Sequence, residues 1–212
     1  TDFFRDTSHY DKTDRSGPKI FVGEWATREG TPTPNYGAAL GDSAWMTGME
    51  RNSDIIIMAS YAPLLVNVNP DGMQWETNLI GYDAMRSYGS PAYYAQVMFG
   101  TYVGDTVPAS NLENGGPKLF YSVTKDTHQK RVYLKLVNAA SVPKTIDVKF
   151  SGGTLAKTGK LVMLKASSTE ATNTLEQPRN ILPADTPLRN ISSELHYTVP
   201  AYSIQVIQVD QQ

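Results

Sequence analysis

The sequence contains no cysteine, no long apolar run and no marked excess of charge of either sign. Without cysteine the chain forms neither a disulfide nor a thiolate metal site. Cysteine usage therefore does not distinguish an oxidising compartment from a reducing one. The 19 Lys and Arg against 21 Asp and Glu leave no cationic excess for nucleic acid or an anionic surface. The longest apolar stretches, such as residues 55–59, are far shorter than the roughly 20 residues of a membrane span. We therefore expect neither nucleic acid nor a membrane as a partner.

Motifs for metal, phosphate and serine-nucleophile chemistry are also missing. His9, His128 and His196 lie far apart, and none has a second His or a carboxylate at ligand spacing. No glycine-rich loop joins a strand to a helix, and Gly-x-Ser-x-Gly does not occur. We therefore expect no metal and no cofactor.

What is present is a change of pattern near residue 104, where we predict a domain boundary between residues 1–103 and 104–212. In the first part, residues 19–23 and 55–61 are continuous apolar runs, which is typical of strands buried on both faces. Residues 36–52 between them have the length of a helix. The order strand, helix, strand predicts a parallel sheet of an α/β domain.

The rest of the first part is predicted to be a loop and a helix. Residues 62–87 show no clean period, and a loop of that length inside a compact domain is usually functional. Ser90 and Pro91 then provide an N-cap and a proline at the first helical position, so that residues 92–99 continue as a helix.

The second part has the pattern of an antiparallel β-sandwich. Its apolar residues alternate with polar ones or are β-branched, and Gly and Pro residues separate the runs. We expect strands at residues 119–123, 131–137, 145–150, 160–164, 195–199 and 203–209. The predicted fold class is therefore α/β in the first part and all-β in the second.

Glu24 is the residue that we single out for chemistry. It follows directly on the predicted strand 19–23, and the carboxyl ends of parallel strands are where such domains place their sites. A carboxylate in this place could be a metal ligand, a general base or a nucleophile, or it could merely cap a loop or pair with Arg28. Position alone leaves these alternatives open.

Aromatic and amide side chains near Glu24 favour a sugar as substrate, because sugars bind to aromatic faces and to amide and carboxylate groups. Trp25 follows Glu24 directly, and Gln74 and Trp75 lie in the long predicted loop. We predict that Trp25, Gln74 and Trp75 contact the substrate. The alternative for each of the two indoles is ordinary core packing.

Three segments of the first part resemble the C-terminal part of an α-L-arabinofuranosidase of glycoside hydrolase family 51. They read GPKIFVGEWA at residues 17–26, IIIMASYAPLLVN at residues 55–67 and SYGSPAYY at residues 87–94. The β-rich remainder is similar to the family's C-terminal sandwich through YTVPAYSI at residues 197–204.

The resemblance implies a retaining hydrolase that releases terminal α-L-arabinofuranosyl groups from hemicellulose or pectic polysaccharides and oligosaccharides. It implies the C-terminal portion of a (β/α)8 barrel followed by a β-sandwich, with residues 1–103 as strands seven and eight with their helices. Glu24 occupies the place of the family's nucleophile.

The resemblance also implies that the acid/base carboxylate lies upstream of this sequence. Glu50 and Asp54 are expected near the strand starts, at the opposite end of the barrel, while Glu29, Glu76 and Asp83 match no family acid. Asp42 and Asp71 are not assigned this role either, and the adjacent His9 and Tyr10 are not carried over as the family's His-Tyr pair. We therefore expect an upstream half of the same enzyme as a partner, and we expect the isolated chain to hydrolyse nothing.

Two other functions stay open at this stage. The chain could be a non-catalytic carbohydrate-binding β-sandwich with a barrel remnant, or a structural module that only packs against another chain. The sequence is compatible with an oligomer, and it does not decide between a secreted, a periplasmic and a cytoplasmic location.

Overall fold

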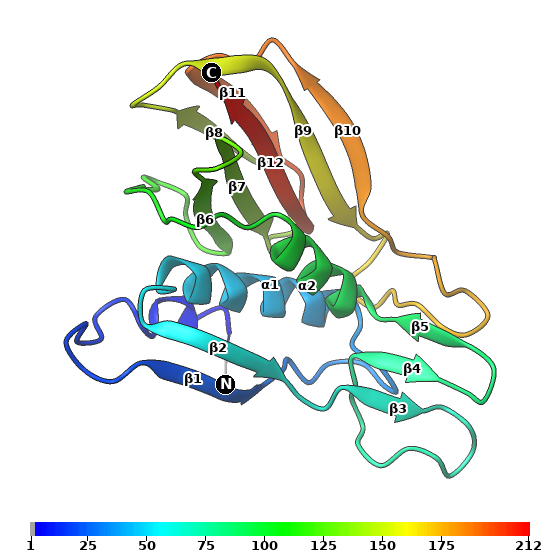
Figure 1. The fold of residues 1–212 in the computed structure, drawn as a ribbon. Coiled ribbons are helices and arrows are strands. Elements are labelled where there is room, and N and C mark those ends of the chain that lie inside the picture. Colours follow the sequence, from blue (N-terminus) through cyan, green and yellow to red (C-terminus); the bar gives the residue numbers. More distant parts are fainter. Residues whose placement is uncertain (1–2) are drawn as a thin grey trace.

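The computed structural model, described here for residues 3–212, is built mostly of strands and has few helices (Figure 1). Two helices, α1 (Tyr36–Arg51) and α2 (Pro91–Thr101), form a layer between a parallel strand pair and a larger antiparallel sheet. A short 3-10 helix, η1 (Asp6–Ser8), packs against α1. Within the described range, none of the helices combines the length and the apolar character that a membrane crossing requires.

The predicted strand, helix, strand unit is confirmed. β1 (Ile20–Trp25) and β2 (Ile56–Tyr61) pair in parallel, and α1 connects them. α1 begins where predicted because the side chain of Asn35 accepts a hydrogen bond from the N–H of Ala38 at 2.9 Å.

α2 is confirmed as well, together with its predicted start. The hydroxyl of Ser90 accepts a hydrogen bond from the N–H of Tyr93 at 3.2 Å, and Pro91 is the first helical residue. Proline suits that position because its missing N–H would have no partner within the helix.

The prediction of a wholly irregular segment at residues 62–87 is wrong in part. Three strands of three residues each lie within or beside it and form a small sheet, namely β3 (Leu65–Asn67), β4 (Ile80–Tyr82) and β5 (Ser87–Gly89). Strands of this length carry too few residues for an alternating pattern to be recognised.

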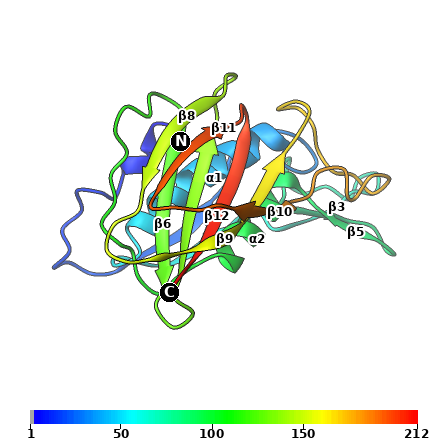
Figure 2. The same cartoon turned by 90° about the horizontal axis from the view of Figure 1, so that it is seen from above.

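The second half of the chain forms two antiparallel sheets. Five strands lie in the order β10-β9-β12-β7-β6, and β11 pairs with β8 in a second sheet of two strands. The seven strands are β6 (Leu119–Asp126), β7 (Arg131–Asn138), β8 (Lys144–Lys149), β9 (Leu155–Lys165), β10 (Ala184–Arg189), β11 (Glu194–Val199) and β12 (Ser203–Gln211). Figure 2 shows β8 and β11 above the larger sheet.

β10 is the strand of this region that the sequence analysis missed. Its residues are mostly exposed and contain Pro187, which removes a backbone donor. β10 lies at the edge of the five-stranded sheet and pairs only with β9, which is where a sheet tolerates proline.

Two hydrophobic clusters hold the layers together. One lies between the helices and the five-stranded sheet, where Tyr36 and Leu40 of α1 meet Val162 of β9 and Ile204 of β12. The other fills the space between the two antiparallel sheets. The first cluster contains residues from both sides of the predicted domain boundary at 103/104, so the two parts of the chain share a core. The boundary itself stays a prediction.

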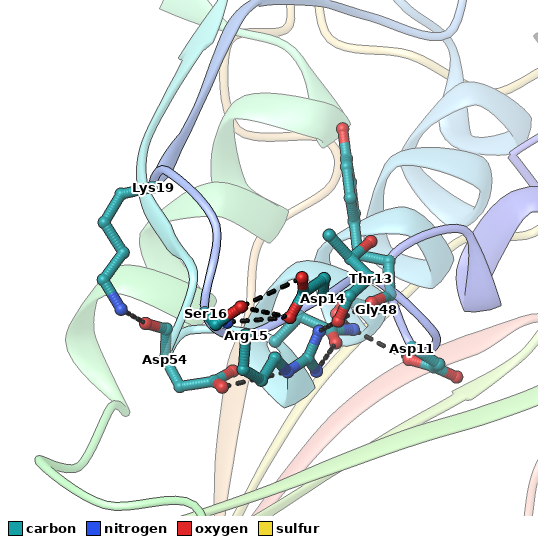
Figure 3. A network of polar contacts seen from close by, with 10 residues as sticks. Asp11, Thr13, Asp14, Arg15, Ser16, Lys19, Gly48 and Asp54 are labelled. Carbon is teal, nitrogen blue, oxygen red and sulfur yellow. Dashed lines mark hydrogen bonds and ion pairs between the residues drawn. The ribbon is translucent and has the colours of Figure 1, made fainter.

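A polar network fixes the segment before β1 to the C-terminal end of α1 (Figure 3). Arg15 donates to the side-chain oxygen of Asn52 at 2.5 Å and pairs with Asp54 at 3.0 Å. The amide of Asn52 donates in turn to Asp11 at 2.7 Å. Asp54 directly precedes the β2 region, so this network lies at the start of the parallel strands, at the end opposite Glu24.

Candidate active site

Glu24 lies beside the last residue of β1, at the carboxyl end of the parallel pair. Trp25 is in register with Tyr61, the last residue of β2, and the N–H of Ala62 donates to the carbonyl of Trp25 at 3.3 Å. The two strands therefore end together. The carboxylate of Glu24 is exposed, and within residues 3–212 it has neither a hydrogen-bond nor an ion-pair partner. It is free to act on a bound molecule.

A hollow surrounds Glu24. Its lining residues come from three places: β1 with the loop that follows it, α1, which contributes Trp45, and the N-terminal segment. The N-terminal segment contributes Phe3, His9 and Tyr10. The sequence analysis set His9 and Tyr10 aside, and the structure places both on the same hollow as Glu24. No periodic pattern surrounds these two residues, so nothing local indicated that they would lie there.

A second hollow holds two of the predicted substrate contacts. Gln74 and Trp75 line it together with Met73 and Glu76, and Arg28 lines both hollows. Trp75 is 58% exposed, so much of its indole is open to a ligand. The structure thus brings Gln74 and Trp75 together and connects their hollow to that of Glu24 through Arg28.

The loop that carries Gln74 and Trp75 is anchored to the loop after β1. The hydroxyl of Thr77 donates to the carbonyl of Gly30 at 2.9 Å, and the N–H of Asn78 donates to the carbonyl of Pro32 at 3.1 Å. The side chain of Asn78 also donates to the carbonyl of Trp75 at 2.6 Å. These bonds hold the second hollow at the same end of the strands as Glu24.

Trp25 is placed differently from the other predicted contacts. It is only 8% exposed, and its ring lies 6.1 Å from that of Phe3 and 5.2 Å from that of Tyr61. An indole enclosed in this way supports the strand end, while it also lines the hollow of Glu24. Its contact with substrate stays a prediction.

Structural contacts engage several of the other carboxylates that the sequence analysis weighed. Glu29 lines the hollow of Glu24, but it accepts a hydrogen bond from the amide of Asn35 at 3.0 Å. Glu50 is paired with Lys135 between α1 and β7, and Asp54 is paired with Arg15. Within residues 3–212, no three His, Cys, Asp or Glu side chains are grouped so that they could hold a metal ion.

A buried acid, to which the sequence analysis assigned no role, lies behind the strand ends. Asp42 of α1 is fully buried, and its Oδ1 accepts a hydrogen bond from the N–H of Thr27 at 2.8 Å. Burial raises the pKa of Asp42 to about 7, against the smaller lowering effect of the Thr27 N–H and of the nearby Thr27 and Tyr61 hydroxyls. An isolated Asp within a helical segment gives no local indication of this environment.

Comparison with known proteins identifies the family of the chain. Residues 23–203 match the family described as the α-L-arabinofuranosidase C-terminal domain. The chain is 30% identical to α-L-arabinofuranosidase 1 of Arabidopsis thaliana over 201 residues, which are 92% of this chain and 29% of that protein. It is 32% identical over 203 residues to a probable α-L-arabinofuranosidase A of Aspergillus oryzae, covering 94% of this chain and 31% of that protein. The chain therefore spans about a third of the length of these relatives.

Solved structures show the same likeness in three dimensions. The arabinose-bound α-L-arabinofuranosidase MgGH51 superimposes with a TM-score of 0.91 at 32% identity, over 99% of this chain and 35% of that one. The family 51 enzyme of Thermotoga petrophila shares the fold with a TM-score of 0.78 at 16% identity, over 98% of this chain and 47% of that one. With its sequence and its fold both matching, the chain belongs to the α-L-arabinofuranosidases of glycoside hydrolase family 51, as a C-terminal part of such an enzyme.

Proposed function

We propose that this chain carries the nucleophile of a retaining α-L-arabinofuranosidase and that Glu24 is that nucleophile. The observation that carries the proposal is the free, exposed carboxylate of Glu24 at the carboxyl end of a parallel strand, in a hollow that Arg28 joins to a second one. The substrates proposed are hemicellulose or pectic polysaccharides and oligosaccharides that end in α-L-arabinofuranosyl groups.

In the proposed reaction, the carboxylate of Glu24 attacks the anomeric carbon while the bond to the leaving oxygen breaks. A second carboxyl group, about 5–5.5 Å away in retaining enzymes, protonates that oxygen and then activates the water that hydrolyses the glycosyl ester. Glu29, the other carboxylate on the hollow, is held by Asn35. The acid/base is therefore proposed to come from an upstream part of the enzyme.

The exposed surface of the parallel pair supports an upstream partner. Within the described residues, β1 and β2 pair only with each other, and their apolar side chains Phe21, Ile57 and Met58 are exposed, Ile57 by 66%. Unpaired strand edges and exposed apolar side chains of this kind are usually covered by another part of a protein. We propose that residues 1–103 are strands seven and eight of a (β/α)8 barrel, with their helices, and that residues 104–212 are the β-sandwich attached to it.

The proposed substrate site extends from Glu24 into the second hollow. Trp75 offers an exposed aromatic face, and Gln74 offers both a donor and an acceptor to sugar hydroxyls. Arg28 lies where the two hollows meet. We propose that Gln74 and Trp75 contact the sugar and that Trp25 supports Glu24 from behind.

The test is hydrolysis of an aryl α-L-arabinofuranoside by the full-length enzyme that carries this sequence. Glu24→Gln is expected to lower kcat by at least about 10³-fold, because an amide cannot replace the attacking carboxylate. Glu194→Gln is the matched control, since Glu194 is an exposed carboxylate on β11 that lines neither hollow. Its kcat should stay within about threefold of wild type.

Acid quenching during turnover identifies the residue directly. The peptide that contains Glu24 is expected to gain the mass of one pentosyl group in the wild type and not in Glu24→Gln. A pentosyl group on another peptide would refute the assignment of Glu24. Sugar binding without any turnover by the full-length enzyme would instead favour the non-catalytic carbohydrate-binding module.

A further inference from the structure

Three polar groups meet in the protein interior directly behind the ends of β1 and β2. The carboxyl of Asp42 is 0% exposed, and only its Oδ1 has a partner, the N–H of Thr27 at 2.8 Å. Its Oδ2 is buried without a hydrogen-bond partner among residues 3–212, as are the hydroxyls of Thr27 and Tyr61. Buried polar atoms without partners are uncommon in native structures and call for an explanation.

Asp42 is linked to the chain on both sides of Glu24's strand end. Thr27, whose N–H donates to Asp42, lies three residues after Glu24, in the loop that follows β1. Tyr61 ends β2, is in register with Trp25, and stacks edge-on against its indole with ring centres 5.2 Å apart. One carboxyl group on α1 therefore lies against the ends of both parallel strands.

The helix approaches this loop so closely that a glycine is required beside Asp42. A Cβ added to Gly41 would lie 2.8 Å from the hydroxyl oxygen of Thr27. The contact between α1 and the loop after β1 is consequently tight, and a shift of the Asp42 side chain is transmitted to Thr27.

The neutral acid suits these surroundings better than the carboxylate. No cation pairs with Asp42 within the described residues, and the titratable group that faces it is Tyr61, whose pKa is raised mainly by burial and further by the charge of Asp42. A protonated carboxyl keeps its acceptor for the N–H of Thr27 and gains an O–H that can donate to a neighbouring hydroxyl. Protonation thus removes an uncompensated buried charge, and Oδ2 can still form a hydrogen bond with a neighbouring hydroxyl.

We propose that Asp42 is a positioning residue for Glu24, which in its neutral form ties the ends of β1 and β2 to α1. This inference rests on the proposed function, because it assigns Asp42 a part in setting where the nucleophile stands. Asp42 is fully buried and touches no substrate, so it acts only through Thr27 and Tyr61. Displacement of a reacting group by about 1 Å can lower a rate about 10²-fold.

The test compares Asp42→Asn with Asp42→Leu in the full-length enzyme, using an aryl α-L-arabinofuranoside. Asparagine keeps the acceptor for Thr27 and is neutral, so kcat should stay within about threefold of wild type at acidic pH. Leucine removes the acceptor, and kcat should fall about 10- to 100-fold with a smaller change in KM. Asp54→Asn is the matched control, because Asp54 lies at the opposite end of the strands, and its kcat should not change.

The pH profile distinguishes this role from a merely structural one. As pH rises through about 7, wild-type Asp42 becomes charged, whereas Asn does not. The ratio of kcat for Asp42→Asn to kcat for wild type should therefore rise across neutral pH. Tyr61→Phe, which removes a hydroxyl that lowers the pKa of Asp42, should shift this rise to higher pH.

The proposal is overturned if Asp42→Asn loses as much activity as Asp42→Leu, since the ionised form would then be required. It is also overturned if Asp42→Leu keeps the wild-type kcat, or if the Asn to wild-type ratio does not change with pH. If Asp42→Leu fails to fold, the pH profiles of kcat for Asp42→Asn and Tyr61→Phe test the proposal without it. An inactive wild-type enzyme would refute the proposed function, and the titration of Asp42, followed through the pH dependence of unfolding, would still decide its protonation state.

Discussion

The ammonium group of Lys135 on β7 contacts the carboxylate of Glu50 on α1, between the helix layer and the five-stranded sheet. Lys135 is fully buried, and burial lowers its pKa while the charge of Glu50 opposes that change. The second oxygen of Glu50 accepts a hydrogen bond from the hydroxyl of Ser122 at 2.5 Å. The carboxylate of Glu50 thus joins the helix that follows Glu24's strand to two strands of the second half, to β7 by an ion pair and to β6 by a hydrogen bond.

Glu50→Gln is expected to lower the free energy of unfolding by about 3 kcal/mol, because it leaves a buried ammonium without its counter-charge. Urea denaturation measures the change. Glu194→Gln is the matched control, since Glu194 pairs with Lys149 at 3.6 Å where both side chains are 74% exposed. An exposed pair contributes little, so that variant should change stability by less than about 1 kcal/mol. Equal losses in the two variants would contradict this account of the Lys135 pair.

Tyr36→Phe tests the second link between the two halves of the chain. The hydroxyl of Tyr36 at the start of α1 lies 2.7 Å from the carbonyl oxygen of Leu164 and 2.9 Å from that of Tyr202. Removing it takes this hydroxyl donor away from the two carbonyls, and we expect a loss of about 1–3 kcal/mol in unfolding free energy. Tyr82→Phe, at an exposed tyrosine of β4, should have no measurable effect in the same experiment. A smaller loss at Tyr36 than at Tyr82 would refute the link.

Stability should depend on pH through Asp42. Its pKa is raised from 3.8 to about 7 in the folded protein, so the folded state binds more protons than the unfolded state between these values. The contribution of Asp42 to the free energy of unfolding is therefore fully present below about pH 4. It is lost as pH rises toward about 7, at up to about 1.4 kcal/mol per pH unit. The measurement is the unfolding free energy at several pH values for wild type and Asp42→Asn. Parallel curves for the two proteins would show that Asp42 does not titrate in this range.

Trp25 and Trp75 should respond differently to substitution. Trp75→Ala removes an exposed ring, so the melting temperature should stay close to wild type while KM for an arabinofuranosyl oligosaccharide rises about tenfold. Trp25→Ala empties a buried site and should lower the unfolding free energy by about 3–5 kcal/mol. Calorimetry and steady-state kinetics on the full-length enzyme separate the two effects. Unchanged kinetics in Trp75→Ala would remove Trp75 from the proposed substrate site.

Local features of the chain were sufficient to predict the elements around Glu24. The apolar runs that became β1 and β2 indicate strands, although the predicted burial on both faces is not met in the described residues, where Phe21 and Ile57 are exposed. Asn35 and Ser90 are capping residues whose action needs only their own helix. The position of Glu24 at a strand end follows from the same pattern. β10 could not be predicted, because an edge strand that contains Pro187 and is mostly exposed lacks the apolar alternation that marks a strand.

The sequence by itself determined the strand, helix, strand unit, the place of Glu24 at its end and the likeness to family 51, since each depends on residues that are neighbours along the chain. Only the tertiary structure decided that Trp25 is enclosed, that His9 and Tyr10 line the hollow of Glu24, and that Asp42 is buried against Thr27. These facts depend on which faces of distant segments are pressed together. Burial, and with it the pKa of Asp42, is a property of that packing and leaves no pattern in the order of the residues.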